Sequence, residues 1–492
     1  MIHLFKLNGY DIVLDVNSGA IHEVDDETYM VLEYMQDRFC FAEGEFSAKQ
    51  SDGAFTALGM EEIASELKDH FCGDKMSESD VDEILEDIME LANEGQLFSE
   101  DVFQPMAEEL KGRNSVLKAM CLHVAHACNM DCEYCFAGKG EYHGAAGLMS
   151  YETGKAAMDY LVANSPGRTN LEVDFFGGEP LLNWEVVKQL VAYGRSIEKE
   201  NGKNFRFTLT TNGLLLDDEV IEFCNREMSN VVISLDGRKE TNDRMRHTKE
   251  GGGTYDLIID KFKKFVRARK GEYYMRGTYT RNNLEFTKDL FHMADEGFSE
   301  LSIEPVVAPP EAPYALHDED AGILCEEYEK LALEMIKRRD EGRGFSFYHY
   351  TIDFEGGPCI AKRISGCGVG TEYMAVTPEG DLYPCHQFVG DEKFILGNLY
   401  DGITHPEVKE LFTGCNVYSH EECGDCFARL YCSGGCAANA YHSTGSVSGV
   451  YELGCTVHRK RIECAIMMKV DEINTAYKNT KNDISQKTVN KV

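Results

Sequence analysis

Between about residues 118 and 339, short apolar runs alternate with longer segments whose apolar residues recur every three or four positions. The short runs predict buried strands, and the longer segments predict amphipathic helices. Successive β–α units of this kind favour an α/β fold whose parallel sheet curls into a partial (β/α)6 barrel. The expected strands are Ala119–Val124, Leu171–Phe176, Phe205–Thr210, Val231–Leu235, Tyr273–Thr280 and Leu301–Val306. The expected helices are Tyr151–Ala163, Trp184–Glu198, Asp217–Asn225, Tyr255–Arg267, Leu284–Ala294 and Ala321–Lys337.

The first hundred residues have a different pattern. Alternating apolar and polar positions at Ile2–Leu7, Asp11–Val16 and Ile21–Val24 predict a small β-sheet. Three amphipathic helices are expected after it, and the last of them has Ser79 as its predicted N-cap. These helices are Asp25–Tyr34, Met60–His70 and Ser79–Asn93. Three strands followed by three helices predict a winged-helix-like domain over residues 1–100, ahead of a barrel over 115–345.

After residue 345 the regular pattern is lost. Gly and Cys become frequent over residues 346–475, and the expected helices are short. Metal clusters would supply the cross-links that such an irregular segment lacks. Residues 476–492 have low hydrophobicity and are predicted to form a disordered tail.

Charge and cysteine content restrict the classes of function. The formal net charge is −36, from 85 acidic and 49 basic residues, which disfavours binding to nucleic acids or anionic membranes. Neither a secretory signal nor an apolar run of about 18 residues is present, so we expect a cytoplasmic protein without a membrane span. Because disulfides are rare in that compartment, the 18 cysteines point to metal ligation or redox chemistry.

The first cysteine group directly follows the first expected barrel strand. Cys128, Cys132 and Cys135 are spaced so that three thiolates on one loop can ligate three irons of a cubane cluster. The fourth iron would remain open to a small chelating molecule. The alternative is a structural zinc site with Cys121 or His126 as the fourth ligand.

This spacing, with the aromatic Tyr134 before the third cysteine, resembles the signature of the radical S-adenosylmethionine (SAM) superfamily. The resemblance implies a [4Fe–4S] cluster that chelates SAM and releases a 5′-deoxyadenosyl radical. It also implies SAM contacts at the ends of the following strands. The cofactor-binding candidates are Tyr134, Gly177, Gly178, Glu179, Asn212, Ser234, Asp236 and Arg276. Of these, Glu179 is expected to accept from the SAM ammonium, Arg276 is expected to pair with the SAM carboxylate, and the two glycines are expected to let the backbone approach the ligand.

A second cysteine group lies in the irregular segment and resembles the SPASM extension of radical SAM peptide-modifying enzymes. The resemblance implies two auxiliary [4Fe–4S] clusters, and so three clusters in all. Carried over by position, the second auxiliary cluster takes Cys423, Cys426, Cys432 and Cys455, and the first takes Cys367, Cys385 and Cys436. Cys359 is either the fourth ligand of the first auxiliary cluster or leaves it with an open iron. A zinc ribbon on Cys423, Cys426, Cys432 and Cys436 is the alternative.

From residue 1 to about Lys469 the chain resembles the SCIFF maturases, which act on ribosomally made peptides with six cysteines in about forty-five residues. The likeness includes Val16–Ala20, Cys121–His123 and Ala375–His386. It implies an N-terminal domain that binds a leader peptide, thioether bonds between Cys sulfur and a Thr side chain, and an external electron donor of the ferredoxin or flavodoxin type. No catalytic side chain is assigned beyond the cluster and SAM ligands.

Several alternatives share these motifs. They are carbon–carbon linkage, peptide epimerisation, formylglycine-type oxidation, and a non-catalytic iron–sulfur or zinc scaffold. His386 stands where sulfatase-maturing SPASM enzymes have an Asp base, which disfavours the formylglycine reaction.

Overall fold

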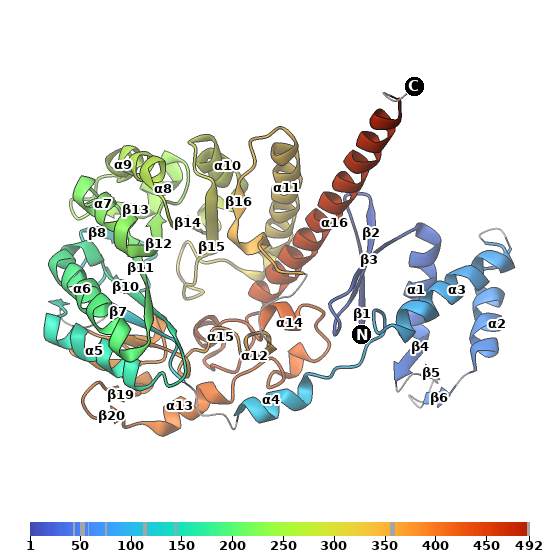
Figure 1. The fold of residues 1–492 in the computed structure, drawn as a ribbon, viewed down its shortest axis with the longest axis horizontal. Coiled ribbons are helices and arrows are strands. Elements are labelled where there is room, and N and C mark those ends of the chain that lie inside the picture. Colours follow the sequence, from blue (N-terminus) through green and yellow to red (C-terminus); the bar gives the residue numbers. More distant parts are fainter. Residues whose placement is uncertain are drawn as a thin grey trace.

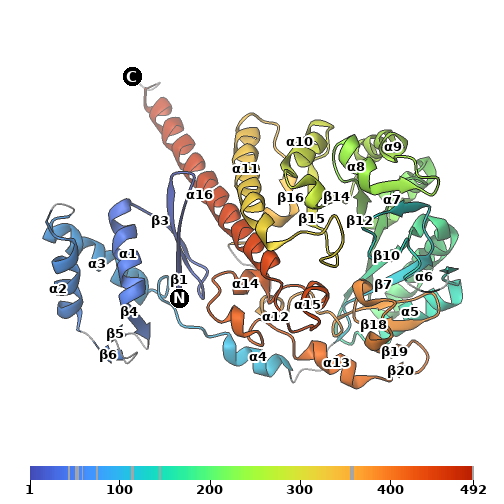
Figure 2. The same ribbon diagram turned by 180° about the vertical axis from the view of Figure 1, so that it is seen from behind.

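The computed structural model describes residues 1–42, 45–49, 55–57, 59–73, 76–111, 116–142, 144, 146–354 and 360–489. The barrel and the N-terminal domain lie on opposite sides of the molecule, and the cysteine-rich C-terminal segment lies between them along one side (Figure 1). The long helix α16 (Glu452–Val489) passes between the barrel and the N-terminal sheet in both ribbon views (Figures 1 and 2). None of the helices in these ranges is both long enough and apolar enough to cross a membrane.

The body of the barrel is a parallel sheet in the order β15–β14–β12–β11–β10–β7. Its strands are β7 (Ala119–His126), β10 (Asn170–Gly177), β11 (Asn204–Thr211), β12 (Met228–Ser234), β14 (Glu272–Tyr279) and β15 (Glu300–Pro305). The helices that follow them are α5 (Tyr151–Ala163), α6 (Trp184–Asn201), α7 (Asp218–Glu227), α9 (Tyr255–Ala268), α10 (Thr287–Asp295) and α11 (Ala321–Asp340). The predicted α/β fold with a parallel sheet is therefore confirmed.

Alternating apolar residues hold the strands against the outer helices. On β11, Phe205 and Phe207 are almost fully buried, and the ring of Phe207 stacks on Phe175 of β10 at a centroid distance of 5.7 Å. Gly194 lets α6 approach this layer, because an added Cβ would lie 2.8 Å from the Phe207 ring. Burying each such side chain stabilises the fold by about 1.5–3 kcal/mol.

Some short elements were not predicted from the sequence. They are β8 (Met130–Cys132), β9 (Gly147–Leu148), α8 (Lys239–Met245), β13 (Arg246–Thr248) and β16 (Ser346–Phe347). Strand β8 lies within the first cysteine loop and pairs antiparallel with β13, which places Cys132 opposite Arg246. The strands among them have only two or three residues, which is too short to produce a readable periodicity.

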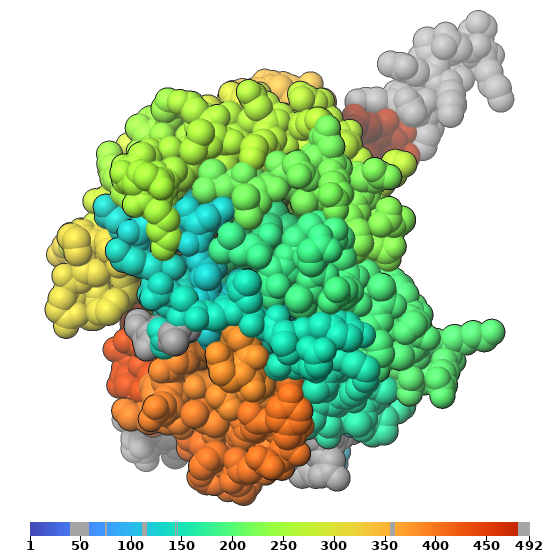
Figure 3. All heavy atoms as spheres, turned by 90° about the vertical axis from the view of Figure 1, so that its left-hand side faces the viewer, coloured from blue at the N-terminus to red at the C-terminus, as the bar shows by residue number. Residues whose placement is uncertain are grey.

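The cysteine-rich segment extends the barrel sheet. Strand β17 (Tyr373–Val376) pairs in parallel with β7, so hydrogen bonding continues across the predicted boundary near residue 345. Figure 3 shows the residues coloured orange packed directly against those of the barrel. The remaining strands are β18 (Asp381–Tyr383), β19 (Gly397–Asn398) and β20 (Gly402–Ile403), and the short helices are α12 (Ile360–Ser365), α13 (Pro406–Thr413), α14 (Arg429–Cys432) and α15 (Ala437–Thr444).

The tail that was predicted to be disordered continues helix α16 as far as Val489. It contains neither Gly nor Pro, so nothing in the sequence ends the helix there. Residues 490–492 lie outside the described ranges.

The N-terminal domain begins with the predicted antiparallel sheet β1 (Ile2–Leu7), β2 (Tyr10–Asp15) and β3 (Ile21–Val24). Its helices are α1 (Asp26–Arg38), α2 (Met60–Phe71), α3 (Glu78–Asn93) and α4 (Gln104–Lys111). An unpredicted sheet, β4 (Phe39–Ala42), β5 (Glu45–Lys49) and β6 (Phe55–Ala57), separates α1 from α2, so the expected order of three strands and then three helices was wrong. The N-cap of α3 is Ser77, whose side chain accepts from the Asp80 amide, and not Ser79.

Side-chain contacts attach the N-terminal sheet to the C-terminal segment. The imidazole of His3 stacks on Phe427 at a centroid distance of 3.5 Å, and its Nε2 lies 3.0 Å from Glu463 Oε1 of α16. Tyr10 donates to Asp471 Oδ1 on the same helix over 2.8 Å. The sheet is therefore fixed in orientation relative to the second cysteine group.

Candidate functional site

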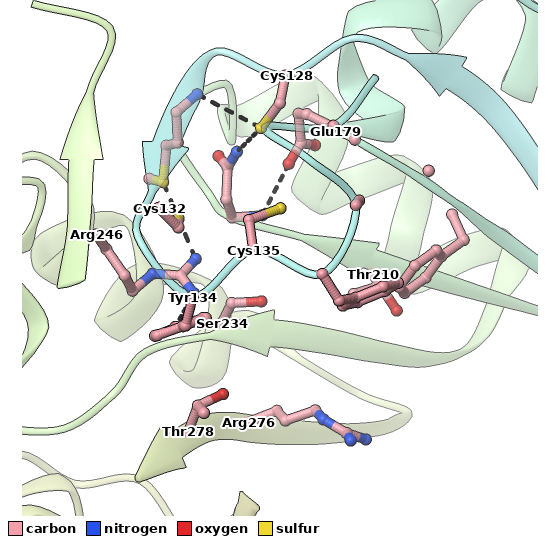
Figure 4. A pocket seen from close by; sticks show the side chains of 18 of the residues that line it. Cys128, Cys132, Tyr134, Cys135, Glu179, Thr210, Ser234, Arg246, Arg276 and Thr278 are labelled. Atoms are coloured by element: carbon pink, nitrogen blue, oxygen red, sulfur yellow. Dashed lines mark hydrogen bonds between the residues drawn. The ribbon is translucent and has the colours of Figure 1, made fainter. Parts of the chain in front are cut away.

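A cavity of about 240 Å³ opens where the barrel strands end, and we call it the cofactor cavity. Its walls are formed by the loop after β7 and by the ends of β10, β11, β12, β14 and β15. All three predicted cluster cysteines line it, together with Tyr134, Gly177, Gly178, Glu179, Asn212, Ser234 and Arg276. Figure 4 shows the cysteines on one side of this space and Ser234, Arg276 and Thr278 on the other. Residues from distant parts of the sequence are thus brought together at one cavity.

The cysteine loop is held by neighbours that take up its polar atoms. Cys128 Sγ accepts from the Met130 amide at 3.4 Å and lies 3.6 Å from Asn212 Nδ2. Burial raises the pKa of Cys132 to about 12, against the opposing charge of Arg246. Thiols with raised pKa values are neutral until a metal displaces their protons, so ligation at this loop would release protons.

The two glycines of the Gly177–Pro180 segment serve close backbone packing. An added Cβ would lie 2.3 Å from Ala125 O at Gly177 and 2.1 Å from Ala127 O at Gly178. Gly177 also has a φ of 125°, which side-chain-bearing residues rarely adopt. The two glycines therefore let the backbone approach the end of β7 and the start of the cysteine loop, and both also line the cofactor cavity, where a ligand contact remains a prediction.

Glu179 is buried at the base of the cofactor cavity, with 1% of its surface exposed. Its Oε1 accepts from Thr211 Oγ1 at 2.8 Å and from the Leu181 amide at 3.0 Å, and its Oε2 accepts from the Asn212 amide at 2.8 Å. Burial raises the pKa of this carboxyl, and the three hydrogen bonds oppose that rise. A carboxylate held in this way offers its free lone pairs to a cationic ligand group.

Asp236 differs from the other candidates because it does not line the cavity. Its Oδ2 accepts from the Tyr134 hydroxyl at 2.6 Å, and its Oδ1 accepts from the Thr278 amide at 3.0 Å. Arg246 Nη1 donates to the same tyrosine oxygen at 3.0 Å. Asp236 therefore positions Tyr134 and the strand end, and a direct cofactor contact does not follow from this geometry.

Arg246 is a site residue that the sequence did not reveal, and Thr211 is one that was not chosen as a candidate beside Asn212. Arg246 lines the cofactor cavity with 7% exposure, opposite Cys132 on the β8–β13 pair. No motif surrounds it, and only its place after the short helix α8 brings it to the loop. Thr211 directly follows Thr210 at the end of β11, a position that the strand-end rule alone could have indicated.

Arg276 lines the cavity from β14, but its guanidinium has a partner within the protein. Its Nη2 lies 3.5 Å from Glu304 Oε1, and 55% of the side chain is exposed. His349 Nε2 approaches the same oxygen at 3.1 Å. Burial alone would raise the pKa of Glu304, but the contacts with His349 and Arg276 outweigh it and lower that pKa. A ligand carboxylate at Arg276 would therefore compete with Glu304.

A second cavity, of about 350 Å³, is lined by Cys423, Cys426, Cys432, Cys436 and Cys455, and we call it the five-cysteine cavity. Glu304 and Pro305, at the end of β15, line both this cavity and the cofactor cavity. The two spaces are therefore neighbours that share part of one wall.

The remaining predicted ligands gather near Cys436. Cys385 is buried, and its pKa is raised by that burial and by the nearby thiols of Cys436 and Cys367. Cys436 thus lies within the five-cysteine cavity and close to the other pair, as interleaved ligation requires. Cys359 lies outside the described residues.

The donor sets suit sulfur-ligated clusters. Among the described side chains, no three His, Cys, Asp or Glu groups converge on a point that could hold one metal ion. The cysteines instead surround cavities of about 240 and 350 Å³, with room for a group larger than an ion. Thiolates are the protein ligands of iron–sulfur clusters, so the residues fit such groups.

Family comparisons agree with this geometry. The model of the radical SAM superfamily matches residues 122–290, and that of the SPASM iron–sulfur cluster-binding domain matches residues 367–427. The chain therefore contains a radical SAM domain followed by a SPASM domain. A radical SAM domain implies a [4Fe–4S] cluster and SAM, and a SPASM domain binds additional clusters.

The chain is homologous to anaerobic sulfatase-maturating enzymes. It is 26% identical over 338 residues to the cysteine-type enzyme of Clostridium perfringens (strain 13 / Type A), which covers 63% of this chain and 85% of that one. An uncharacterized protein of Archaeoglobus fulgidus is 27% identical over 340 residues, covering 67% of this chain and 77% of the relative.

Solved structures share the fold. Native anSMEcpe with bound AdoMet and peptide has a TM-score of 0.60 and 22% identity, covering 73% of this chain and 99% of that one. Streptococcus suis SuiB bound to precursor peptide SuiA has a TM-score of 0.50 and 14% identity, covering 91% of this chain and 97% of that one.

Proposed function

We propose that this protein is a radical SAM maturase that forms thioether cross-links in a cysteine-rich precursor peptide made on the ribosome. The observation that carries the proposal is the wall at Glu304 and Pro305, which is shared by the cofactor cavity and the five-cysteine cavity. A peptide side chain at the end of β15 would lie beside both spaces. Joining a substrate thiol to a substrate carbon requires this proximity, because both partners must be held at one place.

The residues of the cofactor cavity have separate tasks in this proposal. When bound and reduced, a [4Fe–4S] cluster with SAM supplies a carbon radical that removes one hydrogen atom from the substrate. Cys128, Cys132 and Cys135 would hold the cluster, and Glu179 would accept hydrogen bonds from the SAM amino group. The rings of Phe136 and Phe176 line the same space and would help to exclude water from it.

His386 separates this proposal from formylglycine formation. It stands where the sulfatase-maturing enzymes that this chain resembles have an aspartate base. Its Nδ1 lies 3.3 Å from the Tyr373 hydroxyl, and burial together with the charge of Arg276 lowers its pKa to about 4. The position therefore carries a neutral imidazole at pH 7 and no carboxylate base.

The N-terminal sheet supports the leader-binding part of the proposal. Within the described residues, β1 and β3 are its two edge strands, and an extended peptide can bind such an edge as an added strand. The contacts of His3 and Tyr10 with α16 would keep a bound leader in a fixed relation to the C-terminal segment. A purely structural cap on the barrel is the alternative role.

The full proposal includes three [4Fe–4S] clusters, with the auxiliary ligands as assigned from the sequence, and an external electron donor of the ferredoxin or flavodoxin type. Carbon–carbon linkage or epimerisation would use the same cavity residues. The chemical change found in the peptide product distinguishes these reactions from thioether formation.

The test is anaerobic reconstitution followed by reaction with SAM, a reductant and a cysteine-rich peptide encoded beside the gene. Three clusters predict about twelve irons per chain. We expect 5′-deoxyadenosine, loss of two hydrogen atoms per cross-link, and one blocked thiol per link. Deoxyadenosine with all thiols free would refute thioether formation but keep the radical enzyme. Reconstituted protein with little iron and no SAM cleavage would refute the whole proposal.

A further inference from the structure

The five-cysteine cavity is lined by a buried cation that has no carboxylate partner. Arg461, on α16, has 7% of its surface exposed. Its Nη2 donates to the Tyr328 hydroxyl at 2.5 Å, and its guanidinium lies over the Tyr328 ring at 4.8 Å from the centroid. Its Nε has no hydrogen-bond partner within the described structure. The charge therefore rests against a neutral tyrosine.

The acidic group that most influences Arg461 is already engaged elsewhere. Among the described residues, no Asp or Glu oxygen lies within ion-pair distance of Arg461, and Glu304 acts on it only from farther away. Glu304 Oε1 is itself contacted by His349 at 3.1 Å and by Arg276 at 3.5 Å. His349 is a neutral hydrogen-bond donor near pH 7, because burial lowers its pKa. One carboxylate between the two guanidinium groups of Arg276 and Arg461 still leaves a local excess of positive charge beside the cavity.

His458, one turn before Arg461 on α16, lines the same cavity. Its Nε2 is buried and has no partner in the described part of the chain. Buried polar nitrogens are normally hydrogen-bonded, and buried charges are normally paired. An anion with acceptor atoms in the cavity would supply a partner for both nitrogens, with His458 in the tautomer that carries its proton on Nε2.

We propose that Arg461 is the counter-charge of the iron–sulfur cluster in the five-cysteine cavity and raises the reduction potential of that cluster, with His458 as a hydrogen-bond donor to its sulfur atoms. Four thiolates outweigh the charge of a cubane core, so the bound group is an anion, and reduction makes it more negative. A fixed cation in a poorly solvated site stabilises the reduced form more than the oxidised form.

Other arginines at this cavity do not meet the same conditions. Arg429 is buried and its Nε also lacks a partner, but its Nη2 lies 3.0 Å from Asp101 Oδ2 and 2.7 Å from Asn17 Oδ1, so its charge is paired. Arg459 is only half-buried and donates to Thr456 Oγ1 at 3.2 Å. Water screens its charge, which makes Arg459 a matched control on the same helix and at the same cavity.

This inference goes beyond the proposed function but rests on its assignment of a cluster to this cavity. The test is a potentiometric titration of the anaerobically reconstituted full chain, followed by electron paramagnetic resonance. The titrations use a parent variant in which Cys128, Cys132 and Cys135 are changed to Ala. This variant lacks the cluster of the cofactor cavity, so only the paramagnetic resonance signals of the auxiliary clusters remain. In Arg461→Met we expect one auxiliary midpoint potential to become more negative, while Arg461→Lys stays near the wild type and Arg459→Met shifts less.

The possible results separate the two proposals. Unchanged potentials in Arg461→Met at wild-type iron content, or an equal shift in Arg459→Met, would overturn the role of Arg461. If Arg461→Met lost about four irons per chain while Arg461→Lys kept them, the counter-charge role would be supported in its strongest form. A wild-type protein without auxiliary iron would overturn this inference together with the proposed function.

Discussion

The hydroxyl of Tyr134 donates a 2.6 Å hydrogen bond to Oδ2 of Asp236. This bond joins the cysteine loop to the segment that follows β12, and Arg246 donates to the same tyrosine oxygen at 3.0 Å. The three groups are buried, so breaking either bond leaves a polar atom away from water without its partner. This hydroxyl is therefore one of the contacts that position the loop over the cofactor cavity.

Removing that hydroxyl should weaken cofactor binding. Tyr134→Phe leaves Asp236 and Arg246 each short of a hydrogen-bond partner, which costs about 1–3 kcal/mol. If this cost destabilises the SAM-bound state, SAM affinity falls by about 5- to 150-fold. The measurement is anaerobic equilibrium dialysis of SAM. Tyr193→Phe, a change at a tyrosine on the outer helix α6, is the control. Unchanged affinity in Tyr134→Phe would show that the loop is positioned by other contacts.

Glu179→Gln tests the base of the cavity. Glutamine keeps the shape of Glu179 but has one carbonyl acceptor, so it cannot accept from Thr211, Leu181 and Asn212 and also serve an ammonium. We expect SAM affinity to fall at least about tenfold, because a charge-assisted bond is worth about 1.5–3 kcal/mol. Iron content should remain at the wild-type level. Loss of iron would instead assign Glu179 to holding the loop.

Cysteine substitutions should divide the chain into ligands and non-ligands. Cys128→Ala and Cys432→Ala are each expected to remove about four irons per reconstituted chain, because a cubane needs its thiolates. Cys121→Ala and Cys415→Ala are the matched controls and should keep the full content. Cys121 is buried on β7 a few residues before the loop, and Cys415 donates to Val447 O at 3.2 Å. Loss of iron from a control variant would reassign the ligands.

The barrel could be predicted from the sequence because its strands and helices are long and strongly patterned. The predicted Tyr151–Ala163 helix coincides with α5 at both ends, and its N-cap is Ser150. The β4–β6 sheet was missed because its strands are short, and the helical extension of the tail was missed because polarity was taken to indicate disorder. The pattern of apolar and polar residues indicates only local preferences. It could not predict the β7–β17 pairing, because that pairing joins residues that are remote in the chain.

Some residues of the candidate site could be predicted from the sequence and others could not. Cys128, Glu179 and Asn212 could be predicted because each follows a strand in a recognisable motif. Arg246 could not, because its role comes from the pairing of β13 with β8, which no local pattern encodes. The partners of Asp236 and Arg276 depend on side-chain geometry, and the sequence alone could not distinguish a cofactor contact from a protein contact.

Asp174 should make stability depend on pH. Burial and the charge of Glu172 raise its pKa from 3.8 to about 7. Because the folded pKa is the higher one, this group stabilises the fold most below pH 3.8, and that contribution is lost as pH rises through 7. Asp174→Asn should therefore increase the free energy of unfolding by about 1–3 kcal/mol at pH 8 and so raise the unfolding temperature there. At pH 4.5 the substitution should change the unfolding temperature little.

Scanning calorimetry at the two pH values would test the Asp174 prediction. Asp159→Asn, at an exposed position of α5 that pairs with Lys155, is the control. An equal gain for Asp174→Asn at both pH values would mean that titration of this carboxyl is not the cause.

The contact between His3 and Phe427 should couple leader binding to the reaction. Phe427→Ala removes the stacked ring and loosens the N-terminal sheet from the C-terminal segment. We expect the affinity for the leader peptide to change less than twofold, while modification of the full precursor slows about tenfold because the tethered core is less well placed. Fluorescence binding and timed mass spectrometry would measure the two effects. Equal losses in both would show that the ring supports the leader site itself.

The pairing of β17 with β7 has a consequence for synthesis of the protein. While the chain emerges from the ribosome, much of one edge of β7 has no partner until Tyr373–Val376 has been made. An apolar strand with an open edge can pair with other chains, so the growing chain is most prone to aggregation during this interval. The barrel cannot be excised as an independent unit without leaving that edge exposed, and its completion depends on the segment that carries the auxiliary cysteines.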